Sequence, residues 1–289
     1  MNALPFAFCD SVCAILKEVD FEDLIDANYG AWRAAASSNR DERVNIYMRS
    51  GIINVDFRNV WTYRIGKKTK EGKSFITFQE LKSLDRRRLH VNLIDLGQRC
   101  YNAHNSTLEE VKAIVNYVLP FVNRAGLRIP NKRSQIPDDF ISELIPLCSS
   151  SVFAAITVER YSREVENFLN IQLHSGSLKG ITIKDHGWSR EFRMAIEEFA
   201  LTKPFRELDF GDSLVFGFGF FEDLFEKQVG SAKTHFNALF SFEFDDLKSF
   251  NEEIQVKSDA KEIVWRRGDG VAVTIRKDSD HVLVITLNQ

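Results

Sequence analysis

One serine and one histidine have the types and surroundings needed for nucleophilic catalysis. Ser213 lies in the segment Gly-Asp-Ser-Leu (211–214), directly after an apolar stretch, and the segment Asp-Ser-Asp-His (278–281) follows later in the chain. In a Ser-His-Asp arrangement, Ser213 would attack an acyl carbonyl, His281 would accept its proton and Asp278 would orient the imidazole ring. These residue types point to hydrolysis of an acyl ester.

The two segments resemble the first and last blocks of the GDSL esterase family. That family completes its site with oxyanion-hole donors from separate Gly and Asn blocks, and no Gly-x-Asn-Asp run lies between Ser213 and His281. Only 67 residues separate these two residues, and the serine motif stands late in the chain, whereas in the family it opens the domain. The esterase is therefore the weaker alternative, and we expect that the chain is not an enzyme.

No other group of residues predicts chemistry. The six histidines do not cluster at the spacing of metal ligands, and Cys9 and Cys13, one helical turn apart, are interpreted as small apolar residues of a helix. The segment 217–219, Gly-Phe-Gly, lacks the third glycine of a dinucleotide-binding loop, and no Walker Gly-Lys-Ser/Thr is present. We expect no metal and no cofactor.

The composition excludes several classes of protein. The 289 residues carry 38 Lys and Arg against 41 Asp and Glu, a formal net charge of −3, which lacks the basic excess of a nucleic-acid binder. The longest uncharged run, 144–158, is too short and too polar to span a bilayer. The first residues lack the basic start of a secretory signal. We expect no nucleic-acid partner, no membrane and a cytoplasmic or nuclear location, while 24 Phe supply a core.

Three short helices are predicted within residues 1–39. Apolar residues recur at helical spacing in the first helix, with Phe8 and Val12 in one row and the two cysteines beside it. Asp20 is a suitable cap for a second helix, and a third follows Gly30. So small a unit cannot bury much apolar surface alone, so part of that surface must face a partner or another part of the chain.

The spacing within this unit resembles an F-box. A Leu-Pro pair opens the first helix, an Ile-Leu pair follows about ten residues later, and an acidic residue, a Leu-Ile pair and a Trp complete the pattern. The resemblance implies binding to the Skp-type adaptor of an SCF-type ubiquitin ligase and its cullin scaffold, while the rest of the chain captures a protein substrate. The implied adaptor contacts or their supports are Leu4, Pro5, Leu16, Leu24, Ile25 and Trp32.

The unit also departs from the family pattern. Residues 6–8, Phe-Ala-Phe, stand where the family usually has an acidic residue, and residues 29–31, Tyr-Gly-Ala, replace the Val-Cys that often precedes the Trp. The whole chain nevertheless resembles the short, divergent F-box proteins expanded in nematodes. A repeat-based binding protein with a decayed F-box remains the alternative.

Residues 40–75 are predicted to form a β-hairpin and a linker. Val44, Ile46 and Met48 alternate with polar residues, and a second alternating run follows the turn near Asn59. The lysine-rich segment 67–73 is interpreted as a solvated basic loop.

Residues 76–250 are predicted to alternate helices and strands. Capping boxes at 77–80 and 106–109 and caps at Ser162 and Ser189 mark helix starts. The extended stretches repeat apolar residues at spacings 0, 3, 5 and 8, which resembles a leucine-rich repeat without its asparagine. The aligned sets are Phe153, Ile156, Val158 and Tyr161; Leu178, Ile181, Ile183 and His186; Phe205, Leu208, Phe210 and Ser213; and Leu239, Phe242, Phe244 and Leu247. We expect an irregular α/β solenoid, with a compact α/β sandwich as the alternative.

Residues 251–289 are predicted to form an antiparallel β-meander that caps the repeats. Its four strands are expected at 254–256, 263–266, 271–276 and 281–287, with turns at glycine- and aspartate-rich segments between them. The predicted fold class is α/β, with an N-terminal three-helix F-box-like module, an irregular leucine-rich-repeat-like solenoid and a C-terminal antiparallel β cap.

Overall fold

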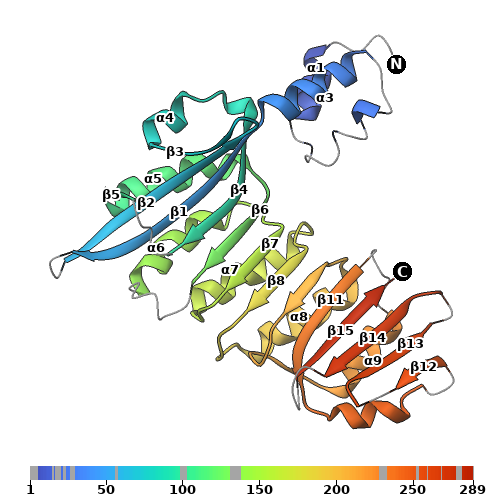
Figure 1. The fold of residues 1–289 in the computed structure, drawn as a ribbon. Helices are drawn as coiled ribbons and strands as arrows, with labels where there is room; N and C mark the ends of the chain where they lie inside the picture. Colours follow the sequence, from blue (N-terminus) through green and yellow to red (C-terminus); the bar gives the residue numbers. More distant parts are fainter. Residues whose placement is uncertain are drawn as a thin grey trace. The chain divides into compact units, whose positions relative to one another are not determined.

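The structure is a computed structural model of mixed α/β class, which confirms the predicted class (Figure 1). It divides into two compact units, residues 1–125 and 126–289. The residues that it describes are 6–14, 16, 21, 24–26, 30–55, 58–97, 103–130, 138–227, 233–251, 254–258, 260–267, 269–277 and 282–288.

The first unit contains helices at both ends of a strand region. Its elements are α1 (Phe6–Cys13), α3 (Ala31–Glu42), β1 (Val44–Val55), β2 (Arg58–Thr69), β3 (Gly72–Ile76), α4 (Phe78–Ser83), a 3₁₀ turn (Arg86–Arg88), β4 (Leu89–Leu96), β5 (His104–Ser106), α5 (Leu108–Val118) and a second 3₁₀ turn (Leu119–Phe121). The strand order is β3-β2-β1-β4, antiparallel except for the parallel pair β1–β4, and β5 also pairs with β2.

The predicted hairpin is confirmed, but the predicted basic loop is wrong. β1 and β2 pair up to Val55 and Arg58, so Asn59 lies beside the turn. Beyond them, Lys68 pairs with Lys73, and only Lys70 and Glu71 form the turn between β2 and β3. Backbone pairing between β2 and β3 outweighs the low strand propensity of lysine at these positions.

Local capping explains where the helices of the first unit begin. The Thr77 hydroxyl accepts a hydrogen bond from the Glu80 amide, and the Glu80 carboxylate accepts one from the Thr77 amide at 2.6 Å, which confirms the predicted capping box. The predicted box at 106–109 is one residue early, because Thr107 caps α5 by accepting from the Glu110 amide. Both helices bury apolar faces, and α5 packs on β2.

The second unit alternates strands and helices before a run of strands. Its elements are β6 (Val122–Ile129, which begins before the boundary), α6 (Asp138–Cys148), β7 (Ala155–Val158), α7 (Arg163–His174), β8 (Gly180–Ile183), α8 (Arg190–Thr202), β9 (Glu207–Asp209), β10 (Val215–Phe216), α9 (Phe218–Lys227), β11 (Lys233–Phe240), a 3₁₀ helix (Phe244–Ser249), β12 (Gln255–Ser258), β13 (Glu262–Arg266), β14 (Ala272–Lys277) and β15 (Val282–Asn288). Ser162 and Ser189 cap α7 and α8, as predicted.

Parallel pairing brings one apolar residue of each of the first three predicted repeats into a single row. Ile156 of β7 pairs with Ile181 of β8, which pairs with Leu208 of β9, and all three are buried. This register confirms that the three positions are equivalent. The next strand of the row is β11, which places Phe236 beside Leu208.

The fourth predicted repeat is therefore wrong. It assigned Phe242 to the row, but Phe242 follows β11, and the next two residues of that set, Phe244 and Leu247, lie in a 3₁₀ helix. In the register that the strand adopts, the four positions of the repeat are Lys233, Phe236, Ala238 and Ser241, so the apolar spacing fits residues 239–247 better than the observed strand, and periodicity alone selects the wrong segment.

The predicted meander is confirmed, and it extends the sheet of the second unit. β12, β13, β14 and β15 are antiparallel neighbours, and β15 also pairs with β11. The meander therefore joins the parallel strands edge to edge, whereas the sequence suggested one face packed against the end of the repeats. Among the described segments, no helix has both the length and the apolar character needed to cross a membrane.

Candidate partner-binding site

The helices at the start of the first unit build a small core of their own. Cys9 and Cys13 of α1 lie against Ala35 and Ala36 of α3, together with Phe21, and all five side chains are fully buried. This confirms the two cysteines as small apolar residues of a helix. Burial raises the pKa of the Cys13 thiol, which keeps it protonated and unreactive.

Most of the residues implied by the F-box resemblance gather around this core. Leu16, Leu24, Ile25 and Trp32 are partly buried and pack against it, and each leaves part of its side chain in solvent. Leu4 and Pro5 lie outside the described residues. The resemblance thus selects residues that come from separate segments and meet at one place.

Two exposed aromatic residues, Phe6 and Phe8, lie on α1, and one of them, Phe8, contacts this group of residues through Trp32. Their side chains are 48% and 50% exposed, and the Phe8 ring packs edge-on against Trp32 with 6.2 Å between ring centroids. The predicted row through Phe8 is therefore not the buried row of α1. The cysteine row faces α3 instead, because the small side chains on both helices allow a close approach that phenylalanine would prevent.

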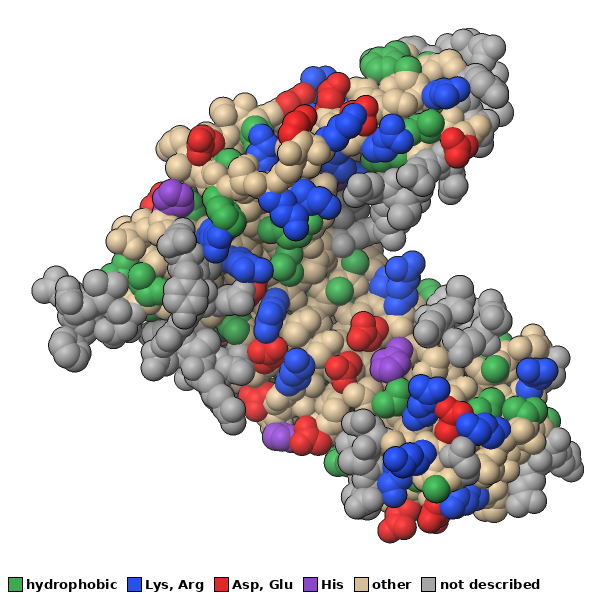
Figure 2. Space-filling model, in the orientation of Figure 1, with side chains coloured by type: hydrophobic (Ala, Val, Ile, Leu, Met, Phe, Trp, Pro, Cys, Tyr) green, Lys and Arg blue, Asp and Glu red, His purple; other side chains and the backbone are tan. Residues whose placement is uncertain are grey.

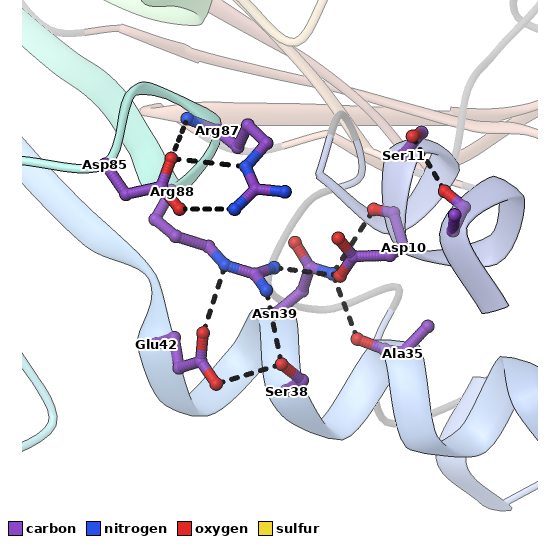
Figure 3. Close-up of polar contacts among 10 residues, drawn as sticks. Asp10, Ser11, Ala35, Ser38, Asn39, Glu42, Asp85, Arg87 and Arg88 are labelled. Carbon is purple, nitrogen blue, oxygen red and sulfur yellow. Dashed lines mark hydrogen bonds and ion pairs between the residues drawn. The ribbon is translucent and has the colours of Figure 1, made fainter.

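A largely buried arginine, Arg88, connects the helices to the strand region (Figure 3). Arg88, from the 3₁₀ turn before β4, places Nη1 3.0 Å from Oδ1 of Asp10 in α1. Its Nε lies 3.2 Å from Oε2 of Glu42, and its Nη2 donates to the Ser38 hydroxyl at 3.3 Å, both in α3. The Asn39 amide also donates to Asp10 at 2.8 Å. One guanidinium group therefore holds both helices.

A second arginine makes a similar bridge. Arg43 donates to the backbone carbonyl of Leu16, lies 4.9 Å from the centroid of the Phe21 ring, and places Nη2 3.0 Å from Nδ1 of His90 in β4. Burial and, next, the charge of Arg43 lower the pKa of His90 to about 4. The imidazole is therefore neutral at pH 7, and its Nδ1 accepts the hydrogen bond from Arg43.

The candidate nucleophile has a structural contact. The Ser213 hydroxyl donates a hydrogen bond to the backbone carbonyl of Ile183 at 3.1 Å, between the ends of two neighbouring repeats. Asp278 and His281 lie outside the described residues. In the parts of the chain that the structure describes, no three His, Cys, Asp or Glu side chains are grouped so that they could hold a metal ion.

The sheet of the first unit carries a second surface feature, which the motifs of the sequence do not reveal. A groove with a volume of about 370 Å³ lies over β1, β2 and β3 and is lined by lysines, arginines, Tyr47 and Phe75. Segment 43–88 contains 12 Lys and Arg against 4 Asp and Glu, although the whole chain is slightly acidic. This local excess of positive charge is the feature of the sequence that indicates the groove, and the slightly negative total charge of the chain hides it.

At the level of class, the chain is an α/β protein whose small helical module is fastened to a strand unit by buried arginines. Comparisons with protein-family models, curated proteins and solved structures give no match. The exposed aromatic residues of the helical module are therefore the basis for assigning a function.

Proposed function

We propose that the chain is the substrate-recruiting adaptor of an SCF-type ubiquitin ligase in the cytoplasm or nucleus. Residues 1–39 would bind a Skp-type adaptor and, through it, the cullin scaffold, and the rest of the chain would hold a protein substrate. The observation that supports this is the contact between the half-exposed Phe8 and the partly exposed Trp32, with Phe6 also half-exposed on the same helix, on a module with its own core. Clustered exposed apolar side chains mark interaction surfaces.

We assign substrate capture to the repeat region. On this proposal residues 40–75 connect the module to an irregular leucine-rich-repeat-like solenoid at 76–250, which residues 251–289 cap. The row Thr157, Thr182 and Asp209 supports a binding role, because these side chains lie in register on neighbouring strands and alternate with the buried row. The chain itself performs no chemistry and raises the concentration of its substrate near the transfer site.

The direct test is a pull-down of purified Skp-type adaptor by the full chain. We expect the wild type to bind, and we expect Leu4→Ala/Pro5→Ala and Phe6→Ser/Phe8→Ser to lose binding while circular dichroism stays unchanged. The matched control is Ile171→Ser/Met194→Ser, which also replaces two half-exposed apolar side chains and should retain binding.

The outcomes separate the candidate functions. Absence of adaptor binding by the wild type overturns the ubiquitin proposal and leaves a repeat-based binding protein with a decayed F-box. Loss of binding in the control variant would show that the effect does not belong to the helical module, and this result would also overturn the assignment of the site.

A further inference from the structure

One face of the first unit's sheet carries an ordered set of cationic and aromatic side chains. Side chains alternate along a strand, so Arg64, Gly66 and Lys68 of β2 lie on the face opposite to the buried Ile65. The register of β2 places Tyr47 of β1 and Phe75 of β3 on either side of Gly66. The groove of about 370 Å³ lies over this face.

Two pairs of like charges face each other across the strands. Arg49 of β1 lies directly opposite Arg64 of β2, and Lys68 of β2 lies directly opposite Lys73 of β3. Like charges in directly opposed positions destabilise a sheet. Asp95 lies 3.9 Å from Arg49, but no carboxylate within the described segments forms an ion pair with Lys68 or Lys73.

This arrangement leaves positive charge on the face. Figure 2 shows Lys and Arg side chains gathered over the region of β1 and β2. A bound polyanion would relieve the repulsion between Lys68 and Lys73 and would add to the compensation that Asp95 gives Arg49, so anion binding would stabilise this arrangement of charges.

An exposed aromatic ring lies among these cations. Phe75 is 63% exposed, and the Arg64 guanidinium lies 3.5 Å from its ring centroid. A Cβ atom at position 66 would lie 3.8 Å from the Phe75 ring. Because Gly66 has no side chain, the groove is deeper at this position. The Tyr47 hydroxyl accepts a hydrogen bond from the Asn92 side chain at 3.2 Å, which fixes the second ring.

We propose that this face binds single-stranded nucleic acid. The two cation pairs contact phosphates, and bases stack on Phe75 and Tyr47, which is the combination that sequence-tolerant single-strand binding uses. An acidic peptide would use the same cations but would leave the exposed part of the Phe75 ring in water. The inference differs from the sequence expectation of no nucleic-acid partner, and it does not depend on the proposed ligase function.

The charge part of the proposal is tested by fluorescence anisotropy of the full chain with a labelled oligouridylate of about twelve nucleotides. With four cations on phosphates, we expect the logarithm of the association constant to fall with the logarithm of salt concentration at a slope of about −3. Lys68→Gln/Lys73→Gln should reduce that slope to about −1.4. The matched control, Lys179→Gln/Lys203→Gln in the second unit, should leave the slope unchanged.

The aromatic part is tested at position 75. Phe75→Ala should weaken binding roughly tenfold, because stacking on a side chain contributes about one to three kcal/mol per base. Phe75→Trp should retain binding, and since the side chain is largely exposed both variants should keep the wild-type circular dichroism spectrum.

Several results would overturn the proposal. These are no binding of the oligonucleotide at about 50 mM salt, equal losses in the control variant, equal affinity for duplex RNA, and equal affinity for a glutamate-rich peptide. The last result would assign the face to acidic proteins.

Discussion

Arg88 and Asp10, which are 78 residues apart in the sequence, form an ion pair with both side chains largely withdrawn from solvent. Their side chains are 11% and 13% exposed, and Arg88 also contacts Ser38 and Glu42. Arg88 therefore connects the helical module to the strands of the first unit through several partners, beside the second connection that Arg43 makes.

Replacing this arginine should destabilise the first unit. Arg88→Met leaves the Asp10 carboxylate in a site poor in water, and we expect the free energy of unfolding to fall by about 2 kcal/mol in urea titrations followed by tryptophan fluorescence. The control is Arg87→Met, because Arg87 pairs with Asp85 at the exposed surface, where solvent screens the ion pair, and its loss should lower the free energy of unfolding much less. Equal effects of the two variants would contradict the special role of Arg88.

The contact between Arg43 and His90 should make stability depend on pH. An unfolded chain takes up a proton on this imidazole near pH 6.5, whereas the folded chain resists protonation down to a pKa of about 4. The contribution of the neutral His90 to the free energy of unfolding is therefore fully present above pH 6.5 and falls as the pH drops from 6.5 towards 4. In His90→Gln, the fall of the urea midpoint between pH 6.5 and pH 4 that comes from this histidine should be absent. The control His186→Gln, at an exposed position, should show the same fall as the wild type. Identical profiles for the two variants would contradict the prediction.

Ser213 should prove to be a structural residue. Ser213→Ala removes the hydrogen bond to the Ile183 carbonyl, and we expect a loss of about 1 kcal/mol in the free energy of unfolding. The control Ser177→Ala, at an exposed position, should change this value less. If the wild type hydrolysed a small acyl ester and Ser213→Ala did not, this result would instead support the esterase alternative.

Charge reversal at Lys73 should stabilise the fold and remove binding. Lys73→Glu converts a pair of like charges with Lys68 into a pair of opposite charges, for which we expect a gain of about 0.5 kcal/mol in the free energy of unfolding. The same change should abolish binding of the oligonucleotide. Lys73→Gln should give intermediate values of both quantities. A less stable Lys73→Glu variant would show that repulsion across the strands is not significant.

The sequence predicts those parts of the fold that local patterns determine. The strand spacing around Ile156, Ile181 and Leu208 and the caps at Ser162 and Ser189 each depend on fewer than ten neighbouring residues, and the structure agrees with them. The strand containing Phe236 could not be selected in this way, because residues 239–247 fit the apolar spacing better, and it is pairing with β9 and β15 that fixes the strand.

The candidate sites, like the fold, could be predicted only where neighbouring residues in the sequence determine them. The resemblance points to Leu24, Ile25 and Trp32, which pack against the core of the helical module, but the buried row of α1 depends on the small side chains that α3 presents. The cationic face could not be recognised from the total charge, because it exists only when the pairing of β1, β2 and β3 brings Arg49 opposite Arg64 and Lys68 opposite Lys73.

The position of β15 has a consequence for synthesis on the ribosome. This strand is later in the sequence than both of its neighbours, yet it lies between them, pairing with β11 on one side and β14 on the other. While β15 is still inside the exit tunnel, β11 and β14 each have an unpaired edge, and such edges are templates for aggregation. A premature stop codon just before Val282 would make this vulnerable state permanent.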